Sequence, residues 1–382
     1  MLDQNKVAVI STGNGGQSIA AYLAFRGFET SLYAREQARV AMFPKDHLFS
    51  IEGVVNAREK VGTISNEMAE VIKDAHVIMV TTPTQYHESI AKQLAPCLQE
   101  GQIVVLNPGR TFGTYAFKRA LEKAGCLQHI FLAEAETFIF ACRCEQPGQA
   151  SILAIKKNVL VAAHDPSDTP FVLSKLDRLF PESFQAARNI FETSFSNIGM
   201  IFHPLPVLLN ITRVEKKEAF LYYKEGITPL VATILEELDH ERLEVAQAYA
   251  TFPATAFEWL NQHYGSLGET LYERIQNTEA YAHILAPTDL HTRYVFEDVQ
   301  TGLVPMYFAG QFAGVQTPAI LAAIQWASAV YQQDFLQKGR NDLSLDFNQI
   351  HADALVAASG LLPSLRMDKN FELTISEKNW TA

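Results

Sequence analysis

The sequence predicts two domains: an N-terminal α/β domain with a doubly wound parallel sheet, and a C-terminal domain made mostly of α-helices. Three observations favour this fold. The chain has 382 residues, which is about twice the length of a common domain. Short apolar runs alternate with helix-like segments in the first half, as in parallel sheets. Beyond about Phe191 the pattern changes to long segments with helical spacing. We therefore divide the chain into residues 1–190 and 191–382.

The strands of the first domain are predicted where short apolar runs stand between turn residues. They are Lys6–Ser11, Glu29–Tyr33, Val77–Thr81, Ile103–Asn107 and His129–Ala133. Amphipathic helix patterns separate them, with QSIAAYLAFR between Gly15 and Gly27 and TQYHESIAKQLAPCL between Pro83 and Gln99. The run SILAIKKNVLVAA at 151–163 is interpreted as two further strands that complete the domain.

The helices of the second domain are predicted from a spacing near 3.6 residues and from the scarcity of turn residues. They are Val207–Tyr223, Leu230–Phe252, Thr255–Tyr264 and Ala319–Phe335, with a shorter helix near Ala352–Leu361. The charged run ILEELDHERLEV is interpreted as a solvated helix face with internal ion pairs. The pattern after Arg340 does not indicate a role for that segment.

Composition excludes several classes of protein. The net charge is −11, from 31 basic and 42 acidic residues, so binding to the phosphates of nucleic acid is not expected. No long apolar run predicts a membrane span, and the segment MLDQNKVAVIS lacks the features of a secretory leader. The four cysteines, Cys97, Cys126, Cys142 and Cys144, form no metal-ligand pattern. We expect a cytoplasmic protein without a metal site.

The clearest local motif is VAVISTGNGGQSIAAYLAFRG, in which a glycine turn follows the first strand and precedes a helix. Gly13 permits the tight turn and Gly15 lets the backbone approach a pyrophosphate, while Ser18 holds the third position of the G-x-G-x-x-G/A fingerprint. The pattern predicts a Rossmann domain whose cofactor contacts include Gly13, Asn14, Gly15 and Gly16. The alternative is a glycine turn that only joins a strand to a helix.

The end of the second strand favours NADP over NAD. An NAD site usually places Asp or Glu about twenty residues after the glycines, where it binds the ribose hydroxyls. This chain instead has Arg35 at that place and Arg39 four residues later. A guanidinium can bind a 2′-phosphate through its planar donors, and the two arginines share a helix face if a helix begins there. The alternative is that both are solvated and that Glu36 contacts the ribose, in which case NAD is used.

Two further loops follow predicted strands of the sheet. Thr82 and Pro83 follow one strand, and Asn107 and Gly109 follow the next. Loops at the carboxyl ends of parallel strands face the crevice where cofactor and substrate meet. We expect Thr82 and Pro83 to line the cofactor, and Asn107 to lie near the nicotinamide and the substrate. Turn chemistry alone is the alternative.

The second domain carries one histidine in a distinctive place. His203 precedes Pro204, and proline suits the first turn of a helix. The pattern therefore places His203 at a helix N-terminus. A histidine there is more often a cap or a packed residue than a catalytic group.

Several segments together resemble the opine dehydrogenase family, of the octopine and nopaline type. In order along the chain they are GNGGQSIAAYLAFRG, NPGRTFG, AEAETFIFACR, HPLPVLLNITRVE, YYKEGITP with LDHERLEVA, and RYVFEDVQTGLVP with TPAI. They span roughly residues 6–340. The resemblance implies an NAD(P)-linked enzyme that joins the amine of an amino acid to a 2-oxo acid and reduces the imine to an N-(1-carboxyalkyl) amino acid.

The resemblance also implies roles for individual residues. The catalytic histidine of the family matches His203, and its acidic partner matches Asp298. The substrate-binding arginine matches Arg293, and the threonine of the AET stretch matches Thr137. Family members often carry an acid where Ala34 stands, a difference that again favours NADP.

The residue types fit this chemistry independently of the family resemblance. Imine formation needs a base for the amine and an acid for the loss of water, and histidine can serve as both. Two alternatives remain: a 2-oxo or 3-hydroxy acid reductase of similar build, and a non-catalytic sensor of NADP(H). The expected partners are small molecules, and the helical domain could supply the face of a homodimer. The sequence does not name the amino acid or the oxo acid.

Overall fold

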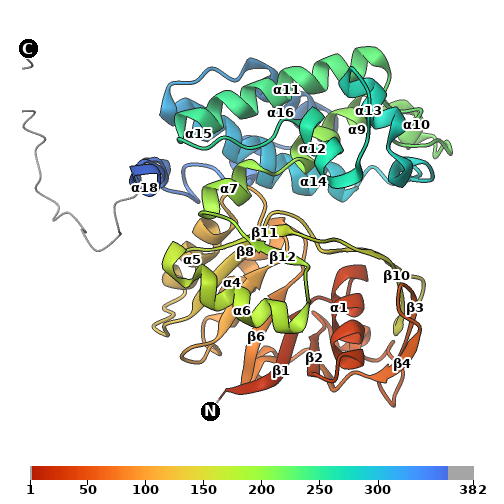
Figure 1. Ribbon diagram of the computed structural model, residues 1–382, viewed down its shortest axis with the longest axis vertical. Helices are drawn as coiled ribbons and strands as arrows, with labels where there is room; N and C mark the ends of the chain where they lie inside the picture. Colours follow the sequence, from red (N-terminus) through yellow and green to blue (C-terminus); the bar gives the residue numbers. More distant parts are fainter. Residues whose placement is uncertain (1, 360–382) are drawn as a thin grey trace, which may run out of the picture.

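The computed structural model describes residues 2–359 and stacks a helical domain on an α/β domain (Figure 1). The main sheet has the strand order β12-β11-β8-β7-β6-β1-β2-β5. The strands are β1 Asp3–Ile10, β2 Glu29–Tyr33, β5 Thr63–Ser65, β6 Ala75–Val80, β7 Ile103–Leu106, β8 Phe131–Ala135, β11 Val159–Ala163 and β12 Phe184–Ala186. Neighbours pair in parallel, except that β8 and β11 are antiparallel. The predicted fold class is confirmed.

A second sheet, which the sequence did not predict, has the order β4-β3-β10-β9. Its strands are β3 Leu48–Gly53, β4 Ala57–Lys60, β9 Phe140–Cys144 and β10 Gln149–Ile155. The two strands predicted within residues 151–163 correspond to β10 and β11, and only β11 joins the main sheet. The turn between β10 and β11 contains Asn158 in the left-handed conformation, at φ 56°, and this turn separates strands that belong to different sheets.

Alternate residues of β1 pack on opposite faces of the main sheet, as a strand requires. Val7 and Val9 join the core that includes side chains of α1 (Asn14–Phe25) and α6 (Thr169–Leu179). Ala8 and Ile10 join the core that includes side chains of α3, α4 and α5. These helices are α3 Met68–Ile72, α4 His87–Leu94 and α5 Gly113–Lys123, and a short helix, α2, covers Gln37–Val40. A sheet covered on both faces explains why all six residues of β6 are buried.

The second domain is helical and has one continuous apolar core. Its helices are α7 Ile190–Phe195, α8 Gly199–Phe202, α9 Pro204–Leu209, α10 Ile211–Glu215, α11 Pro229–Ala248, α12 Ala256–Tyr264, α13 Leu271–Asn277, α14 Arg293–Asp298, α15 Val304–Ala313, α16 Pro318–Tyr331, α17 Phe335–Lys338 and α18 Phe347–Ser359. A π-helical turn, Val299–Leu303, joins α14 to α15. The boundary at residue 190 stays a prediction.

Two of the predicted helices differ from the structure. The segment Val207–Tyr223 is not one helix, because α9 ends at Leu209 and α10 ends before Lys217, which has φ 57°. The side-chain amide of Asn210 bonds the carbonyls of Pro206 and Gly226 at this break, both at 2.8 Å. The predicted helix Ala319–Phe335 likewise divides into α16 and α17, since Gln332 has φ 50°.

The other helix predictions agree more closely. Leu230–Phe252 corresponds to α11 and Thr255–Tyr264 to α12, with Thr255 as the N-cap of a capping box. The helix predicted near Ala352–Leu361 corresponds to α18, and its last two residues lie outside the described part of the chain. The charged run in α11 is not wholly solvated: Arg242 is fully buried and bonds Asp239 at 2.9 Å.

Loops at the carboxyl ends of β6 and β7 join the two domains. Glu297 of α14 accepts a hydrogen bond from the backbone N–H of Thr84 at 3.1 Å. Thr111 donates its backbone N–H to the carbonyl of Thr301 at 3.1 Å. Arg340, which follows α17, donates to the carbonyls of Gly109 and Thr111 at 2.9 and 2.7 Å. The carboxyl-end edge of the sheet at β6 and β7 is therefore held by the helical domain.

Candidate active site

The glycine turn between β1 and α1 has no room for a side chain at Gly15 or Gly16. A Cβ atom added to Gly16 would lie 2.1 Å from the carbonyl oxygen of Ser11, and one added to Gly15 would lie 2.7 Å from the ring of Phe138. Gly13 is the N-cap of α1, and no side chain caps that end of the helix. Backbone N–H groups at an uncapped helix N-terminus bind anions such as a pyrophosphate.

The two predicted arginines lie in different surroundings. The guanidinium of Arg39 donates to the carbonyl of Thr12 at 3.0 Å, beside the glycine turn, and lies over the ring of Phe43 at 5.4 Å. Arg35 pairs with Glu36 at 3.3 Å, and its side chain is 76% exposed. The two arginines were expected to share a helix face only if a helix began at Arg35, and α2 begins at Gln37, so they do not share one. Arg39 is the arginine that the structure fixes next to the turn.

Buried polar atoms gather where β6 and β7 end. The hydroxyls of Thr81 and Thr82 and both side-chain atoms of Asn107 have no hydrogen-bond partner among residues 2–359. Pro83 follows Thr82 and begins the 3₁₀ turn Thr84–Tyr86. Buried polar groups normally have partners, because burying them without one is costly. The unpartnered polar atoms of these loops, together with the glycine turn, are better explained by a site for a dinucleotide with a nicotinamide than by residues that only form turns.

His203 and Asp298 meet in the helical domain, although 95 residues separate them in the chain. His203 is the N-cap of α9, as predicted, and its Nδ1 lies 2.7 Å from Oδ2 of Asp298. Burial alone would raise the pKa of Asp298, but Arg110 and His203 together hold it below its ordinary value. Asp298 is thus a buried carboxylate that can orient and stabilise an imidazolium.

Two tyrosines fix the position of His203. Its ring stacks on Tyr294 with centroids 4.3 Å apart and an angle of 10° between the planes. The hydroxyl of Tyr222 donates to the carbonyl of His203 at 2.6 Å. Because Nδ1 faces Asp298, Nε2 is the ring nitrogen that remains for a substrate.

Arg293 begins the helix that ends at Asp298. Its side chain is 60% exposed, and its Nη1 lies 3.6 Å from Oε2 of the buried Glu297, one helical turn later. The guanidinium therefore keeps free donors on the side that faces solvent. An arginine so placed can bind a carboxylate beside the His203–Asp298 pair.

Thr137 has a partner that the sequence did not suggest. Its hydroxyl accepts a hydrogen bond from Nζ of Lys156 at 3.1 Å. Burial lowers the pKa of Lys156 to about 8; the carboxylate of Glu136 opposes this shift, while Arg110 and Arg293 add to it. Lys156 is thus a cation beside Thr137 whose charge is influenced by the arginines of the site.

Sequence reasoning missed two residues of this site. Arg110 stands in NPGRTFG, where a charged residue after a buried strand was the available signal. Lys156 begins a KKN turn between strands, a pattern that favours a solvated loop. In neither case does the local sequence reveal the neighbours, because these come from other parts of the chain.

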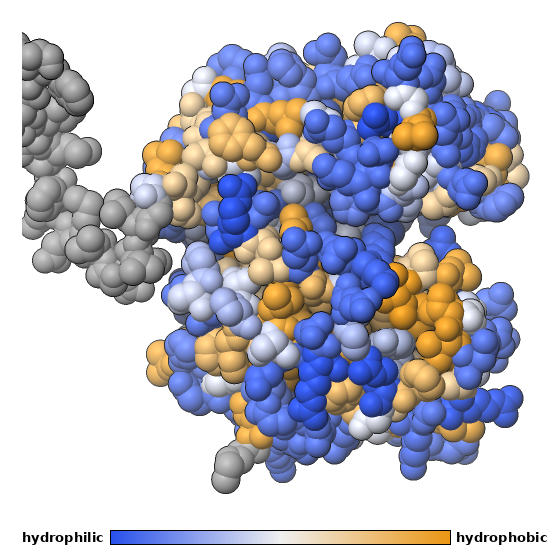
Figure 2. Space-filling view, viewed as in Figure 1, coloured by the Kyte–Doolittle hydropathy of each residue, from blue (hydrophilic) through white to orange (hydrophobic). Residues whose placement is uncertain are grey.

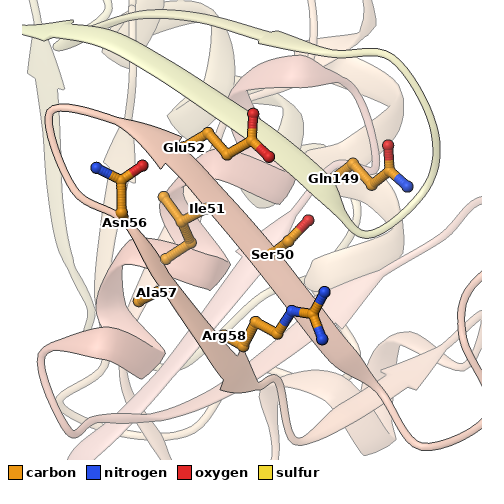
Figure 3. A pocket seen from close by; sticks show the side chains of 7 residues that line it. All are labelled: Ser50, Ile51, Glu52, Asn56, Ala57, Arg58 and Gln149. Atoms are coloured by element: carbon orange, nitrogen blue, oxygen red, sulfur yellow. The ribbon is translucent and has the colours of Figure 1, made fainter.

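The molecular surface is hollowed in two places of interest. Figure 2 shows a gap between the two domains, on the side where β10 and α10 lie. A separate hollow of about 530 Å³ lies over the second sheet and is lined by residues such as Ser50, Glu52 and Arg58 (Figure 3). No predicted site residue lines that second hollow.

No described helix is long and apolar enough to cross a membrane.

A Rossmann domain joined to a helical domain that carries a buried His–Asp pair defines the class of an NAD(P)-dependent oxidoreductase. Two family models match the chain in agreement with this class. Residues 186–331 match the α-helical domain of NAD/NADP octopine/nopaline dehydrogenases. Residues 6–109 match the N-terminus of NAD-dependent glycerol-3-phosphate dehydrogenases.

Curated relatives match over nearly the whole chain. An opine dehydrogenase of Arthrobacter sp. (strain 1C) is 34% identical over 94% of this chain and 99% of its own. The octopine dehydrogenase of Pecten maximus is 26% identical over 87% of this chain and 92% of its own. The chain therefore belongs to the opine dehydrogenase family: it binds NAD(P) and catalyses the reductive condensation of an amino acid with a 2-oxo acid. The reductase and sensor alternatives are rejected.

Solved structures agree in fold. An octopine dehydrogenase in complex with NADH and agmatine superposes with a TM-score of 0.74, at 21% identity, over 96% of this chain and 100% of its own. A yersinopine dehydrogenase with NADP⁺ bound gives a TM-score of 0.71, at 13% identity, over 93% and 98%. At these identities the likeness shows the fold alone.

Proposed function

We propose that His203 and Asp298 are the acid–base pair of this reaction, with Arg293 binding the carboxylate of the 2-oxo acid. The observation that carries the proposal is the 2.7 Å contact between Nδ1 of His203 and the buried Asp298. Asp298 orients the ring through Nδ1, so that Nε2 can take a proton from the amine and return one when water leaves. When bound, the nicotinamide supplies the hydride.

The glycine turn, Thr82 and Pro83 would hold the cofactor, and Asn107 would lie beside its nicotinamide. Gly13, Asn14, Gly15 and Gly16 offer the backbone for its pyrophosphate. The cytoplasm suits a chain whose four cysteines are all unpaired. A homodimer stays a prediction.

The experiment that tests the function is a screen of NADPH oxidation with amino acids crossed against pyruvate, glyoxylate and 2-oxoglutarate. Oxidation should require both substrates, and mass spectrometry should find a secondary amine that contains both. Oxidation that proceeds with the oxo acid alone would contradict the proposed reaction.

We also propose NADPH as the preferred cofactor, because Arg35 and Arg39 stand where NAD sites carry an acid. NADPH should have a lower Michaelis constant than NADH, and Arg35→Asp should narrow the gap by about 10-fold or more, since a charged hydrogen bond is worth about 1.5–3 kcal/mol. Arg58→Asp, on the exposed side of β4, makes the same change of charge and should leave the ratio unchanged. Equal constants for both cofactors in the unmodified protein would contradict the preference.

Lys156 is proposed as a further carboxylate-binding group. Lys156→Met should lower kcat/KM for at least one of the two carboxylate substrates by about 10-fold below pH 8. The pKa near 8 means that the ammonium loses its charge above that pH, so the difference from the unmodified protein should shrink there. The neighbouring Lys157, which pairs with Glu182 at the surface, provides the control: Lys157→Met should change neither constant. A difference that persists unchanged at high pH would exclude a charge effect.

A further inference from the structure

Asp298 lies between a histidine and an arginine that come from different domains. Its Oδ2 is 2.7 Å from Nδ1 of His203, and its Oδ1 is 3.5 Å from Nη2 of Arg110. His203 and Asp298 belong to the helical domain, whereas Arg110 belongs to the loop between β7 and α5 of the α/β domain. The carboxylate of the acid–base pair thus has its second charged neighbour across the domain boundary.

The guanidinium of Arg110 is fixed in place. Arg110 is 7% exposed, and its Nη1 donates to Oδ1 of Asn197 at 3.1 Å. Its Nη2 also lies 3.6 Å from Oε2 of Glu297. Gly199 leaves space for the guanidinium of Arg110, because a Cβ atom at position 199 would lie 2.5 Å from Nη1 of Arg110 and 2.7 Å from Oδ1 of Asp298. The contact depends on a residue without a side chain at position 199.

Arg110 acts on Asp298 through its charge. The distance of 3.5 Å is longer than a normal N–H···O hydrogen bond, and Oδ1 of Asp298 has no hydrogen-bond partner among residues 2–359. Both groups are buried, where the interaction between charges is stronger than in water. Burial would raise the pKa of Asp298, and Arg110 is the largest influence that lowers it.

We propose that Arg110 is a positioning residue of the His203–Asp298 pair, contributed by the nucleotide-binding domain. It keeps Asp298 a carboxylate and ties the pair to the loop that borders the cofactor. The inference rests on the proposed acid–base role of the pair. Arg110 acts through Asp298 and not on the substrate, so the pair has its full electrostatic setting only when the two domains are apposed.

Other charged and titratable groups also face the pair. Arg293 and Glu297 lie on α14 itself, and Tyr294, Tyr222 and Tyr223 surround His203 and Asp298. Burial raises the pKa of each of these three tyrosines, which keeps them neutral at ordinary pH. Arg293 is mainly exposed. Removal of the buried Arg110 should therefore change the electrostatic surroundings of the His203–Asp298 pair most.

The test compares Arg110→Gln with Arg110→Lys. Without the cation, Asp298 and the imidazole both hold a proton more easily, so the midpoint of the pH profile of kcat/KM should rise by about one pH unit or more in Arg110→Gln. Arg110→Lys keeps the charge but loses the planar guanidinium whose Nη1 bonds Asn197 while Nη2 faces Asp298, so it should keep the midpoint and lower kcat. Gly199→Ala displaces the guanidinium without removing it and should raise the midpoint too, which keeps the test decisive if the glutamine variant does not fold.

A readout independent of turnover separates this inference from the proposed function. The NMR ring signals of His203, assigned by their loss in His203→Ala, should titrate at higher pH in Arg110→Gln and in Gly199→Ala. Arg178→Gln is the control for the change of charge: Arg178, on α6 of the α/β domain, bonds the carbonyl of Gln4 and the side chain of Asn5 and contacts neither His203 nor Asp298. An unchanged midpoint in the folded Arg110 and Gly199 variants, or the same rise in Arg178→Gln, would overturn the proposal.

Discussion

His203→Ala is expected to lower turnover by about 10²–10⁴-fold, which is the usual contribution of a positioned acid–base group. Binding of NADPH should change little, because the glycine turn lies in the other domain. Steady-state kinetics with a competent pair of amine and oxo acid would measure the first effect, and fluorescence titration of NADPH the second.

Asp298→Asn should give a smaller but clear loss, since the amide keeps the shape of the carboxylate without its charge. The double variant should be little worse than His203→Ala alone if the two groups act as a unit. If the turnover losses of the two single variants multiply in the double variant, Asp298 has a role that is independent of His203. Near-normal turnover of His203→Ala with every competent substrate pair would refute the acid–base role.

The second large effect is expected at Arg293. Arg293→Lys keeps the charge but loses the two parallel donors that match a carboxylate. We expect the Michaelis constant for the 2-oxo acid to rise by about 10- to 100-fold, which corresponds to roughly 1.5–3 kcal/mol, while the constant for NADPH stays the same.

Arg188 offers a matched control for this substitution. It is also an exposed arginine that pairs with a glutamate one helical turn later, Glu192, at 3.6 Å. Arg188→Lys should leave all constants unchanged. An unchanged oxo-acid constant in Arg293→Lys would assign Arg293 to structure instead of substrate binding.

The sequence predicted most accurately what depends on short local patterns. The glycine turn, the strands β1, β2, β6, β7 and β8 and the helices α11 and α12 each follow from a few neighbouring residues. The pairing of His203 with Asp298 came from a resemblance, because no local pattern relates residues so far apart in the chain.

What escaped prediction depends on contacts between distant segments. β3 and β4 alternate weakly in polarity, and they become recognisable only in the sheet, where β3 pairs with β4 on one side and with the distant β10 on the other. The sequence around Arg242 predicts a surface residue. In the structure its guanidinium is buried and donates to Asp239 and to the carbonyls of Phe195 and Ala254. The break after Leu209 is stabilised by the carbonyl of Gly226, which accepts a hydrogen bond from the side-chain amide of Asn210. In each case the deciding partner lies elsewhere in the chain.

The hydrogen bonds of Arg340 also bear on where this chain can be divided. The match to the α-helical domain ends at residue 331, yet Arg340 lies beyond it and donates to two carbonyls of the loop after β7. A fragment cut at 331 would leave those carbonyls, in the opposite domain, without their buried donor. The loop after β7 is therefore completed by a residue more than two hundred positions further along the chain, so a boundary for expression, or for exchange with a relative, is better placed beyond Arg340 than at residue 331.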